Sequence, residues 1–402
     1  MNNYKDASLS AEERANLLLL DMSVPEKMAQ LQGLIFMSLQ NIDSLRERCL
    51  LGIGSISCLQ MTMTETVQEC LDTQVMLQKI AIESSPHGIP AIFHMEGLCG
   101  AYVPNAVSFP SGLGRASSFD PELEEKIGNV VGKEERAIGI THAFAPVLDI
   151  NRDPRMGRVG ETYGEDATLS AALGAKYVKG CQQESSGRKT DCVAKHFLGF
   201  HLSKGGIHTA DCEISGQALR ETYAKPFQAA ITNSGLRGIM PCYNVINGEP
   251  ISSSKELLSE FLRDEMGFDG VVVSDYDAIK HLHTVQKTAE NLKTAGLQAL
   301  AAGMDLELPI AVCYNEELSE MFSKGDADID VLDRACLRVL AAKFRMGLFE
   351  NPFAASESDA LKILGTDESK EISLLSAKES LVLLRNDGVL PIKNPKNPKN
   401  PK

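Results

Sequence analysis

The chain has 402 residues, of which 43% are hydrophobic, and its 54 acidic and 40 basic residues give a formal net charge of −14 at pH 7. This acidic balance disfavours nucleic acids and anionic membrane surfaces as partners and suits a neutral substrate. The length allows one large core or two smaller ones.

In chain order, predicted helices alternate with short apolar strands. An amphipathic helix is predicted over residues 9–32, and further helices over 65–82, 121–138, 167–181, 221–233 and 255–266. Strands are predicted at 52–59, 89–96, 142–150, 191–197, 238–245, 270–276 and 303–308. Such alternation indicates βαβ units and a parallel sheet. We predict an α/β fold, a TIM-like (β/α)8 barrel whose first strand is irregular, over residues 1–348. An open doubly wound sheet is the alternative.

The chain termini and the cysteines bear on location. Residues 1–6 lack the apolar stretch of a signal peptide, and no apolar run approaches the about 18 residues that cross a bilayer. Ten cysteines occur without a Cys-x-x-Cys pair, which favours reduced core thiols over disulfides or a zinc site. We therefore expect a cytoplasmic protein without a membrane partner. The Lys-Asn-Pro repeats of residues 392–402 predict a disordered tail.

Polar side chains follow five of the predicted strands, where barrel active sites are built. They are Glu96, Asp149, Lys195 with His196, Tyr243 with Asn244, and Ser274 with Asp275. Asp275 ends a buried β-branched run, so it suits a rigid carboxylate nucleophile, although an Asp there could instead cap the next helix.

The remaining candidates suit the binding of hydroxyl groups. Lys195 and His196 are donors for hydroxyls, the alternative being a surface Lys beside a packed His. Arg158 lies in a loop dense in Arg and carboxylate, and it could fork onto vicinal hydroxyls or brace the loop with salt bridges. Glu96 could accept from two hydroxyls or be paired. The spacing of His281 and His283 does not favour a metal site, because the two do not share a helix face.

Together these residues resemble glycoside hydrolase family 3, in its β-glucosidase and β-xylosidase subgroup. The resemblance rests on Ser274-Asp275-Tyr276, on Lys195-His196-Phe197, on Gly157-Arg158 with the segment to Asp166, on residues 145–149, and on Tyr243-Asn244 with Asn247-Gly248. It implies retaining hydrolysis of terminal non-reducing β-D-glycosyl residues, with a small oligosaccharide or β-glycoside as substrate and no cofactor or metal. Asp275 would be the nucleophile, Tyr243 would orient it, and Glu96, Arg158, Lys195 and His196 would bind the sugar.

The resemblance leaves the general acid/base open. In this subgroup it is a carboxylate of a second, α/β-sandwich domain, and residues 349–391 resemble the linker and the start of that domain. We therefore expect impaired activity, and self-association through barrel surface that the second domain would cover. Another branch, the N-acetylhexosaminidases, uses a His in a loop after Lys-His-Phe-Pro-Gly-His-Gly. That motif is not matched here, and His201 and His208 remain candidates for a substitute acid.

Two other functions stay open. One is a non-catalytic sugar-binding barrel. The other is an aldolase-like enzyme that forms a Schiff base on Lys195, which the acidic charge and the missing phosphate-binding glycine loop disfavour.

Overall fold

A parallel sheet forms the centre of the molecule. The computed structural model describes residues 3–36, 42–184 and 190–391. Among these residues seven strands pair side by side, each parallel to its neighbour. In order across the sheet they are β1 (Gly33–Ile35), β2 (Ser55–Ser57), β3 (Ile92–Glu96), β4 (His142–Phe144), β5 (Asp191–Phe197), β7 (Gly238–Pro241) and β10 (Val271–Val272).

An eighth segment links the two edges of this sheet. Leu306 pairs in parallel with Val273, beyond β10, and Glu307 pairs in parallel with Gln32, just before β1. The Ser274 amide donates to the Leu306 carbonyl at 2.8 Å, and the Glu307 amide donates to the Leu31 carbonyl at 3.0 Å. The predicted TIM-like barrel is thus confirmed, with its last strand reduced to isolated bridges.

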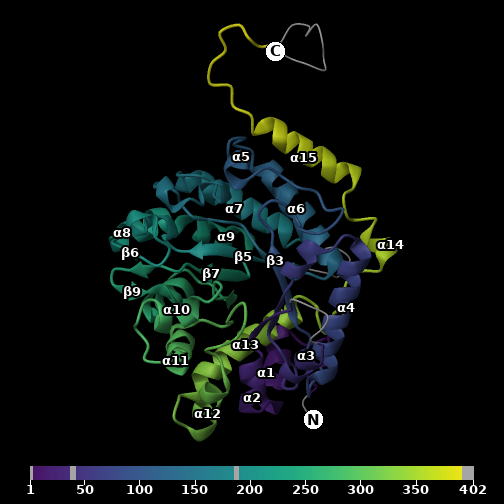
Figure 1. Ribbon diagram of the computed structural model, residues 1–402, viewed down its shortest axis with the longest axis vertical. Coiled ribbons are helices and arrows are strands. Elements are labelled where there is room, and N and C mark those ends of the chain that lie inside the picture. Colours follow the sequence, from purple (N-terminus) through teal and green to yellow (C-terminus); the bar gives the residue numbers. More distant parts are fainter. Residues whose placement is uncertain (1–2, 37–41, 185–189, 392–402) are drawn as a thin grey trace.

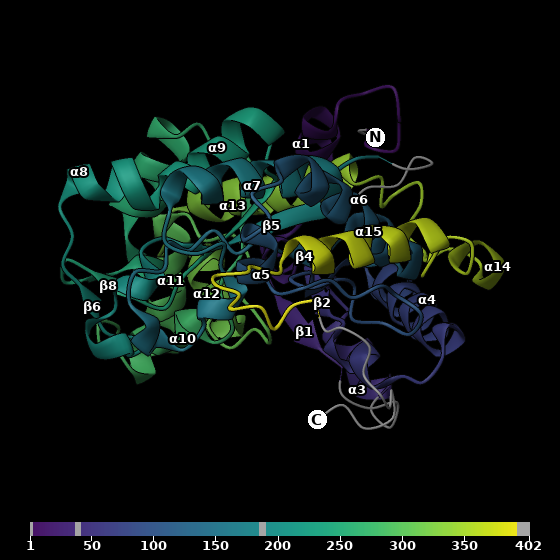
Figure 2. The same ribbon diagram turned by 90° about the horizontal axis from the view of Figure 1, so that it is seen from above.

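Helices surround the sheet (Figures 1 and 2). They are α1 (Ala11–Asp21), α2 (Val24–Ala29), α3 (Ile42–Arg48), α4 (Val67–Ser84), α5 (Gly112–Ala116), α6 (Pro121–Ile138), α7 (Ala167–Cys181), α8 (Gly216–Ala218), α9 (Lys225–Ser234), α10 (Ala278–Thr284), α11 (Leu292–Ala302), α12 (Glu316–Lys324) and α13 (Ile329–Arg345). Two segments, Leu219–Tyr223 and Glu256–Glu265, are π-helical. A small second sheet joins β6 (Asp211–Cys212), β8 (Val245–Ile246) and β9 (Glu249–Pro250).

Helix α6 shows how local signals set the bounds of an element. The Asp120 side chain accepts from the Leu123 amide at 3.0 Å, and Pro121 occupies the first turn, where its missing N–H costs nothing. Gly139 ends the helix at φ 89°, a conformation that glycine adopts without strain. The prediction for residues 121–138 therefore matches the structure in both bounds.

The prediction of one helix over residues 9–32 is wrong. The chain forms α1 and α2, separated at Met22 and Ser23. Ser23 begins α2 with extended backbone, and Glu26 accepts from its amide at 2.7 Å and from its hydroxyl at 2.6 Å. Together with Pro25 in the first turn, this capping box favours a new helix over continuation of the old one.

The C-terminal part packs on the outside of the barrel (Figure 1). It contains α14 (Glu357–Ala360) and α15 (Asp367–Glu379). Glu134 of α6 accepts from the Gly365 amide at 2.9 Å, between these two helices. Residues 381–391 form neither helix nor strand and are exposed. The predicted linker over 349–391 and the predicted self-association stay predictions, and the predicted disordered tail lies outside the described residues.

Two further observations concern the whole described chain. All ten cysteines have free thiols, and nine of them are buried. No helix among the described residues is both long and apolar enough to span a membrane.

Candidate active site

The predicted site residues come from five segments at one end of the sheet. They are Glu96 at the end of β3, Lys195 and His196 in β5, Tyr243 after β7, Asp275 after β10, and Arg158 in the loop between β4 and α7. The carboxyl ends of parallel barrel strands meet at the same mouth, so these side chains converge although they lie far apart in the sequence. A hollow of about 610 Å³ between α6 and α15 is lined by none of them.

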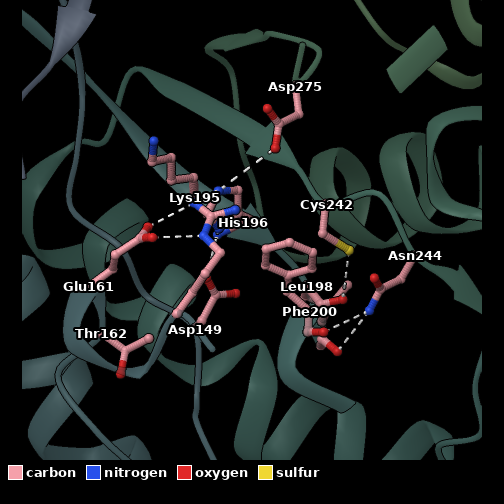
Figure 3. A network of polar contacts seen from close by, with 12 residues as sticks. Asp149, Glu161, Thr162, Lys195, His196, Leu198, Phe200, Cys242, Asn244 and Asp275 are labelled. Atoms are coloured by element: carbon pink, nitrogen blue, oxygen red, sulfur yellow. Dashed lines mark hydrogen bonds and ion pairs between the residues drawn. The ribbon is translucent and has the colours of Figure 1, made fainter. Parts of the chain in front are cut away.

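His196 lies between two carboxylates (Figure 3). Its Nδ1 is 2.7 Å from Asp149 Oδ2, and its Nε2 is 3.7 Å from Asp275 Oδ2. Burial lowers the pKa of His196 well below its usual value, against the opposing charge of Asp275. Because the Arg158 guanidinium can only donate, its contact at 3.2 Å makes His196 Nε2 an acceptor, which leaves Nδ1–H to donate to Asp149. Burial also raises the pKa of Asp149 to about 6.

Both Lys195 and His196 contribute to the site because β5 is irregular there. In a regular strand, consecutive side chains point to opposite faces. Lys195 pairs with Met240 of β7 but Phe197 pairs with Pro241, so β5 carries one extra residue. Such a bulge bends the strand and changes the direction of its side chains.

Asn244, which follows β7, supports the loop after β5, since its side-chain amide donates to the Phe200 carbonyl at 3.0 Å.

Arg158 is held in place before any substrate binds. Its Nε and Nη2 each donate to Glu161 at 2.7 Å, and its guanidinium lies 5.2 Å from the centre of the Phe200 ring. Burial disfavours the charge of Arg158, yet the bond to Glu161 raises its pKa above the usual value. Burial likewise opposes the charge of Glu161, but Arg158 lowers its pKa. A bidentate pair of this kind fixes the guanidinium plane and leaves its other N–H groups for a ligand.

Lys195 and Glu96 form a second ion pair, with Nζ and Oε2 2.6 Å apart. The Lys195 side chain is 4% exposed, whereas the Glu96 side chain is 33% exposed. The ammonium also lies 5.9 Å from the centre of the Phe144 ring. This geometry makes Lys195 the ion-pair partner of Glu96 and gives no support to a Schiff base on Lys195.

One carboxylate oxygen of Asp275 is buried without a hydrogen-bond partner in the part of the chain that the structure describes. Its Oδ1 accepts from the Tyr276 amide at 2.7 Å, while Oδ2 has no hydrogen-bond donor among the described residues. The Tyr243 hydroxyl donates to the Tyr276 carbonyl at 3.0 Å, and burial together with the Asp275 charge raises the pKa of Tyr243. The helix-capping alternative for Asp275 is wrong, because Asp277 occupies the N-cap position of α10.

The other histidines have separate environments. The His208 ring lies 5.2 Å from the Phe200 ring and 6.1 Å from the Tyr243 ring, close to the site. His201 is buried, and its ring lies 5.8 Å from that of Phe200. His281 contacts Tyr243, whereas His283 Nδ1 lies 3.0 Å from the Ala289 carbonyl, so these two do not converge.

Sequence reasoning missed three contributors to the site. The pattern of strand ends identifies Asp149 but not its pairing with His196, and it does not single out Glu161 as the partner of Arg158. The pattern also leaves out His94, whose Nε2 lies 3.2 Å from the hydroxyl of Tyr276, the residue after Asp275, and which shares the Glu96 face of β3 because it lies two residues before it. This spacing of two residues in a strand is the sequence signal that could have placed His94 beside Glu96.

Comparison with known proteins gives the family. The model of the "Glycosyl hydrolase family 3 N terminal domain" matches residues 23–342. A putative β-xylosidase of Formosa agariphila is 35% identical over 98% of this chain and 53% of its own length, and a β-xylosidase of the same organism is 33% identical over 83% and 47%. The chain thus spans about half the length of these curated relatives.

Solved structures agree with this assignment. A β-glucosidase from Erythrobacter marinus has a TM-score of 0.90 at 31% identity, covering 98% of this chain and 53% of that chain. A mutant β-glucosidase from Listeria innocua in complex with laminaribiose has a TM-score of 0.84 at 30% identity, covering 94% and 53%. The barrel, the residues gathered at its mouth and these matches lead to one conclusion: the chain belongs to glycosyl hydrolase family 3.

Proposed function

We propose that this chain carries the sugar site and the nucleophile of a retaining β-glycosidase, with Asp275 as the nucleophile. The observation that carries the proposal is the free Oδ2 of Asp275. It is 3.7 Å from His196 Nε2, at a barrel mouth where Arg158 and Lys195 supply donors. A rigid carboxylate with one unpartnered oxygen beside hydroxyl-binding side chains is what formation of a glycosyl ester requires.

In the proposed reaction, Oδ2 of Asp275 attacks the anomeric carbon. The bond from that carbon to the leaving-group oxygen breaks, and its electron pair stays on the oxygen. A water molecule then attacks the anomeric carbon of this glycosyl ester, and the bond from that carbon to Asp275 breaks, which releases the sugar and restores the carboxylate. The proton that the water loses passes to solvent and balances the proton that the departed leaving-group oxygen takes up. Arg158 and Lys195 donate to sugar hydroxyls, and Glu96 accepts from them. Both ion pairs hold these groups in place before binding, which lowers the entropic cost of reaching the transition state.

None of the carboxylates named above is free to donate a proton to the leaving group. Glu96 is paired with Lys195, Glu161 with Arg158, and Asp149 with His196. Each of these carboxylates is thus already a partner of a neighbouring site residue. Because proton donation is worth roughly 10²–10⁴ in rate, we propose that this chain alone favours glycosides with acidic leaving groups.

The proposed substrates are terminal β-glucosides and β-xylosides. Similar proteins are named β-glucosidases and β-xylosidases, and the Listeria innocua enzyme has been solved with laminaribiose and with glucose. Such sugars carry no charge, and they suit a site in which the charges of Lys195 and Arg158 are already balanced by Glu96 and Glu161.

Turnover of nitrophenyl β-glucoside and nitrophenyl β-xyloside tests the proposal. We expect nitrophenol release by the wild-type chain, and a loss of at least about 10³-fold in Asp275→Asn. Asp277→Asn is the matched control, since this half-exposed carboxylate lies two residues further on in the same loop and is replaced in the same way. Activity that survives Asp275→Asn would refute the proposal. Sugar binding without turnover in any variant would favour a non-catalytic sugar-binding barrel.

A further inference from the structure

The Tyr276 hydroxyl reaches across the barrel mouth to strands β2 and β3. It lies 3.2 Å from Ser57 Oγ and 3.2 Å from His94 Nε2. His94 Nδ1 in turn lies 2.7 Å from Ser55 Oγ. Ser55 and Ser57 are two residues apart in β2 and so share one face of the strand, the face toward the barrel interior. Tyr276, which follows β10, is therefore linked to β2 and β3, and the closing segment at Leu306–Glu307 and β1 lie between β10 and these two strands.

The backbone of Tyr276 is fixed as well. Its amide donates to Asp275 Oδ1 at 2.7 Å, and its carbonyl accepts from the Tyr243 hydroxyl at 3.0 Å. Directly after it, Asp277 adopts φ 61°, a left-handed conformation that costs a non-glycine residue about 1–3 kcal/mol unless its surroundings enforce it. The Asp277 amide donates to the Leu308 carbonyl at 3.0 Å. Anchors thus hold this turn on both sides of Tyr276.

His94, which contacts the Tyr276 hydroxyl, is uncharged. Burial, with a smaller contribution from the charge of His142, lowers the pKa of His94 to about 3. His94 is therefore neutral at ordinary pH. Its ring stacks on Phe144 with centres 4.6 Å apart and planes at 15°, which fixes its orientation. The Tyr276 hydroxyl has one proton, so it can donate to one of Ser57 and His94 and accept from the other.

We propose that Tyr276 is a positioning residue, whose hydroxyl, anchored by Ser57 and His94, keeps Oδ2 of Asp275 aimed at the sugar. The chain of contacts runs from Ser57 and His94 to the Tyr276 ring, then to its amide, and from the amide to Oδ1. With Oδ1 held, rotation of the carboxylate about its terminal bond is restricted, and the other oxygen faces His196. This inference rests on the proposed role of Asp275 as a nucleophile.

Inactivation by a 2-fluoro glycoside with a dinitrophenolate leaving group tests the positioning role. This leaving group departs without a proton, so the rate constant reports attack by Asp275 separately from acid catalysis. Tyr276→Phe keeps the ring and removes the hydroxyl. We expect the limiting inactivation rate constant to fall on the order of ten-fold, because small misplacement of a reacting group costs this much or more. The inhibitor concentration for half-maximal rate should change less than about two-fold.

Tyr314→Phe is the matched control. The Tyr314 hydroxyl is buried and donates to the Met304 carbonyl at 3.0 Å, ahead of the segment that closes the barrel. This variant loses a buried hydroxyl bond of the same kind without touching the turn at Asp275, and its inactivation rate constant should equal that of the wild type. If both variants slow inactivation equally, the effect is one of stability and the inference is overturned.

A double-mutant cycle with Ser57→Ala completes the test. If Ser57 acts through the Tyr276 hydroxyl, Ser57→Ala slows inactivation of the wild type but has no added effect in Tyr276→Phe. Additive effects would overturn the inference, as would an unchanged rate in either single variant. Ser57→Ala also serves if Tyr276→Phe fails to fold. A wild-type chain that is not labelled at Asp275 would refute the proposed function itself, whereas labelling at an unchanged rate in the variants would refute only the positioning role.

Discussion

The ion pair of Lys195 and Glu96 predicts a marked asymmetry between two substitutions. The Nζ–Oε2 distance of 2.6 Å corresponds to a Coulomb attraction of about 6 kcal/mol at an effective dielectric constant of ~20, before desolvation is subtracted. The net cost of removing one partner depends on what surrounds the charge that remains. Lys195 is 4% exposed and cannot be hydrated without rearrangement, whereas Glu96 is 33% exposed and already meets solvent.

Glu96→Ala should therefore destabilise the fold more than Lys195→Met. Loss of Glu96 leaves a buried ammonium without its counter-ion, which costs about 3 kcal/mol in comparable cases. Loss of Lys195 leaves a carboxylate that water can solvate, and the methionine keeps most of the apolar stem, so we expect about 1 kcal/mol.

Urea unfolding of both variants and of the double variant measures the difference in the free energy of unfolding. The dependence of this free energy on urea concentration is taken to be the same for all three proteins. The double variant should be more stable than Glu96→Ala alone, because removal of Lys195 also removes the stranded charge. Each variant should also lose activity toward aryl glycosides. A larger destabilisation in Lys195→Met than in Glu96→Ala would refute the reasoning from burial.

Three further predictions concern residues outside the site. Burial lowers the pKa of Lys343 to about 7, below its unfolded value, so this residue binds fewer protons in the folded state than in the unfolded state between pH 7 and pH 10. The free energy of unfolding of the wild type, minus that of Lys343→Met, should therefore rise by about 1 kcal/mol per pH unit over this range, and urea unfolding of both proteins at several pH values measures it. A methyl group on Gly180 would collide with the backbone of α6, so Gly180→Ala should lower the free energy of unfolding by about 2 kcal/mol, whereas Gly160→Ala, with open space around it, should be neutral in the same assay. Arg115 forms a buried pair with Glu124 at 3.0 Å, so Arg115→Met should cost about 3 kcal/mol and lower the thermal midpoint in a calorimeter.

Much of the fold could be predicted because the local signals are strong. Helix α6 has an N-cap, an N-terminal proline and a C-terminal glycine, and β5 is a run of seven buried residues. Strand β1 has only three residues, too short for any periodicity, and it exists because its neighbours pair with it. The capping box at Ser23 is the sequence signal for the division between α1 and α2. The apolar spacing continues on both sides of Ser23 and therefore predicts a single helix.

The site could be predicted as a set of strand ends but not as a set of contacts. Asp275 and Lys195 follow or end buried runs, and barrel geometry brings such residues together. Whether Arg158 binds Glu161 or a ligand depends on the path of a loop that has no periodic pattern. The same holds for the pairing of Asp149 with His196, which depends on the register of β5 against its neighbours. Tertiary packing decides these contacts, and a single sequence carries no direct signal for them.

Identification of the labelled residue tests the central claim most directly. The wild-type chain is incubated with the 2-fluoro glycoside, digested, and mapped by peptide mass spectrometry. The account predicts one glycosyl adduct, on Asp275, and none in Asp275→Asn. An adduct on Glu96, Glu161 or any other carboxylate of a folded chain whose Asp275 is intact would contradict it.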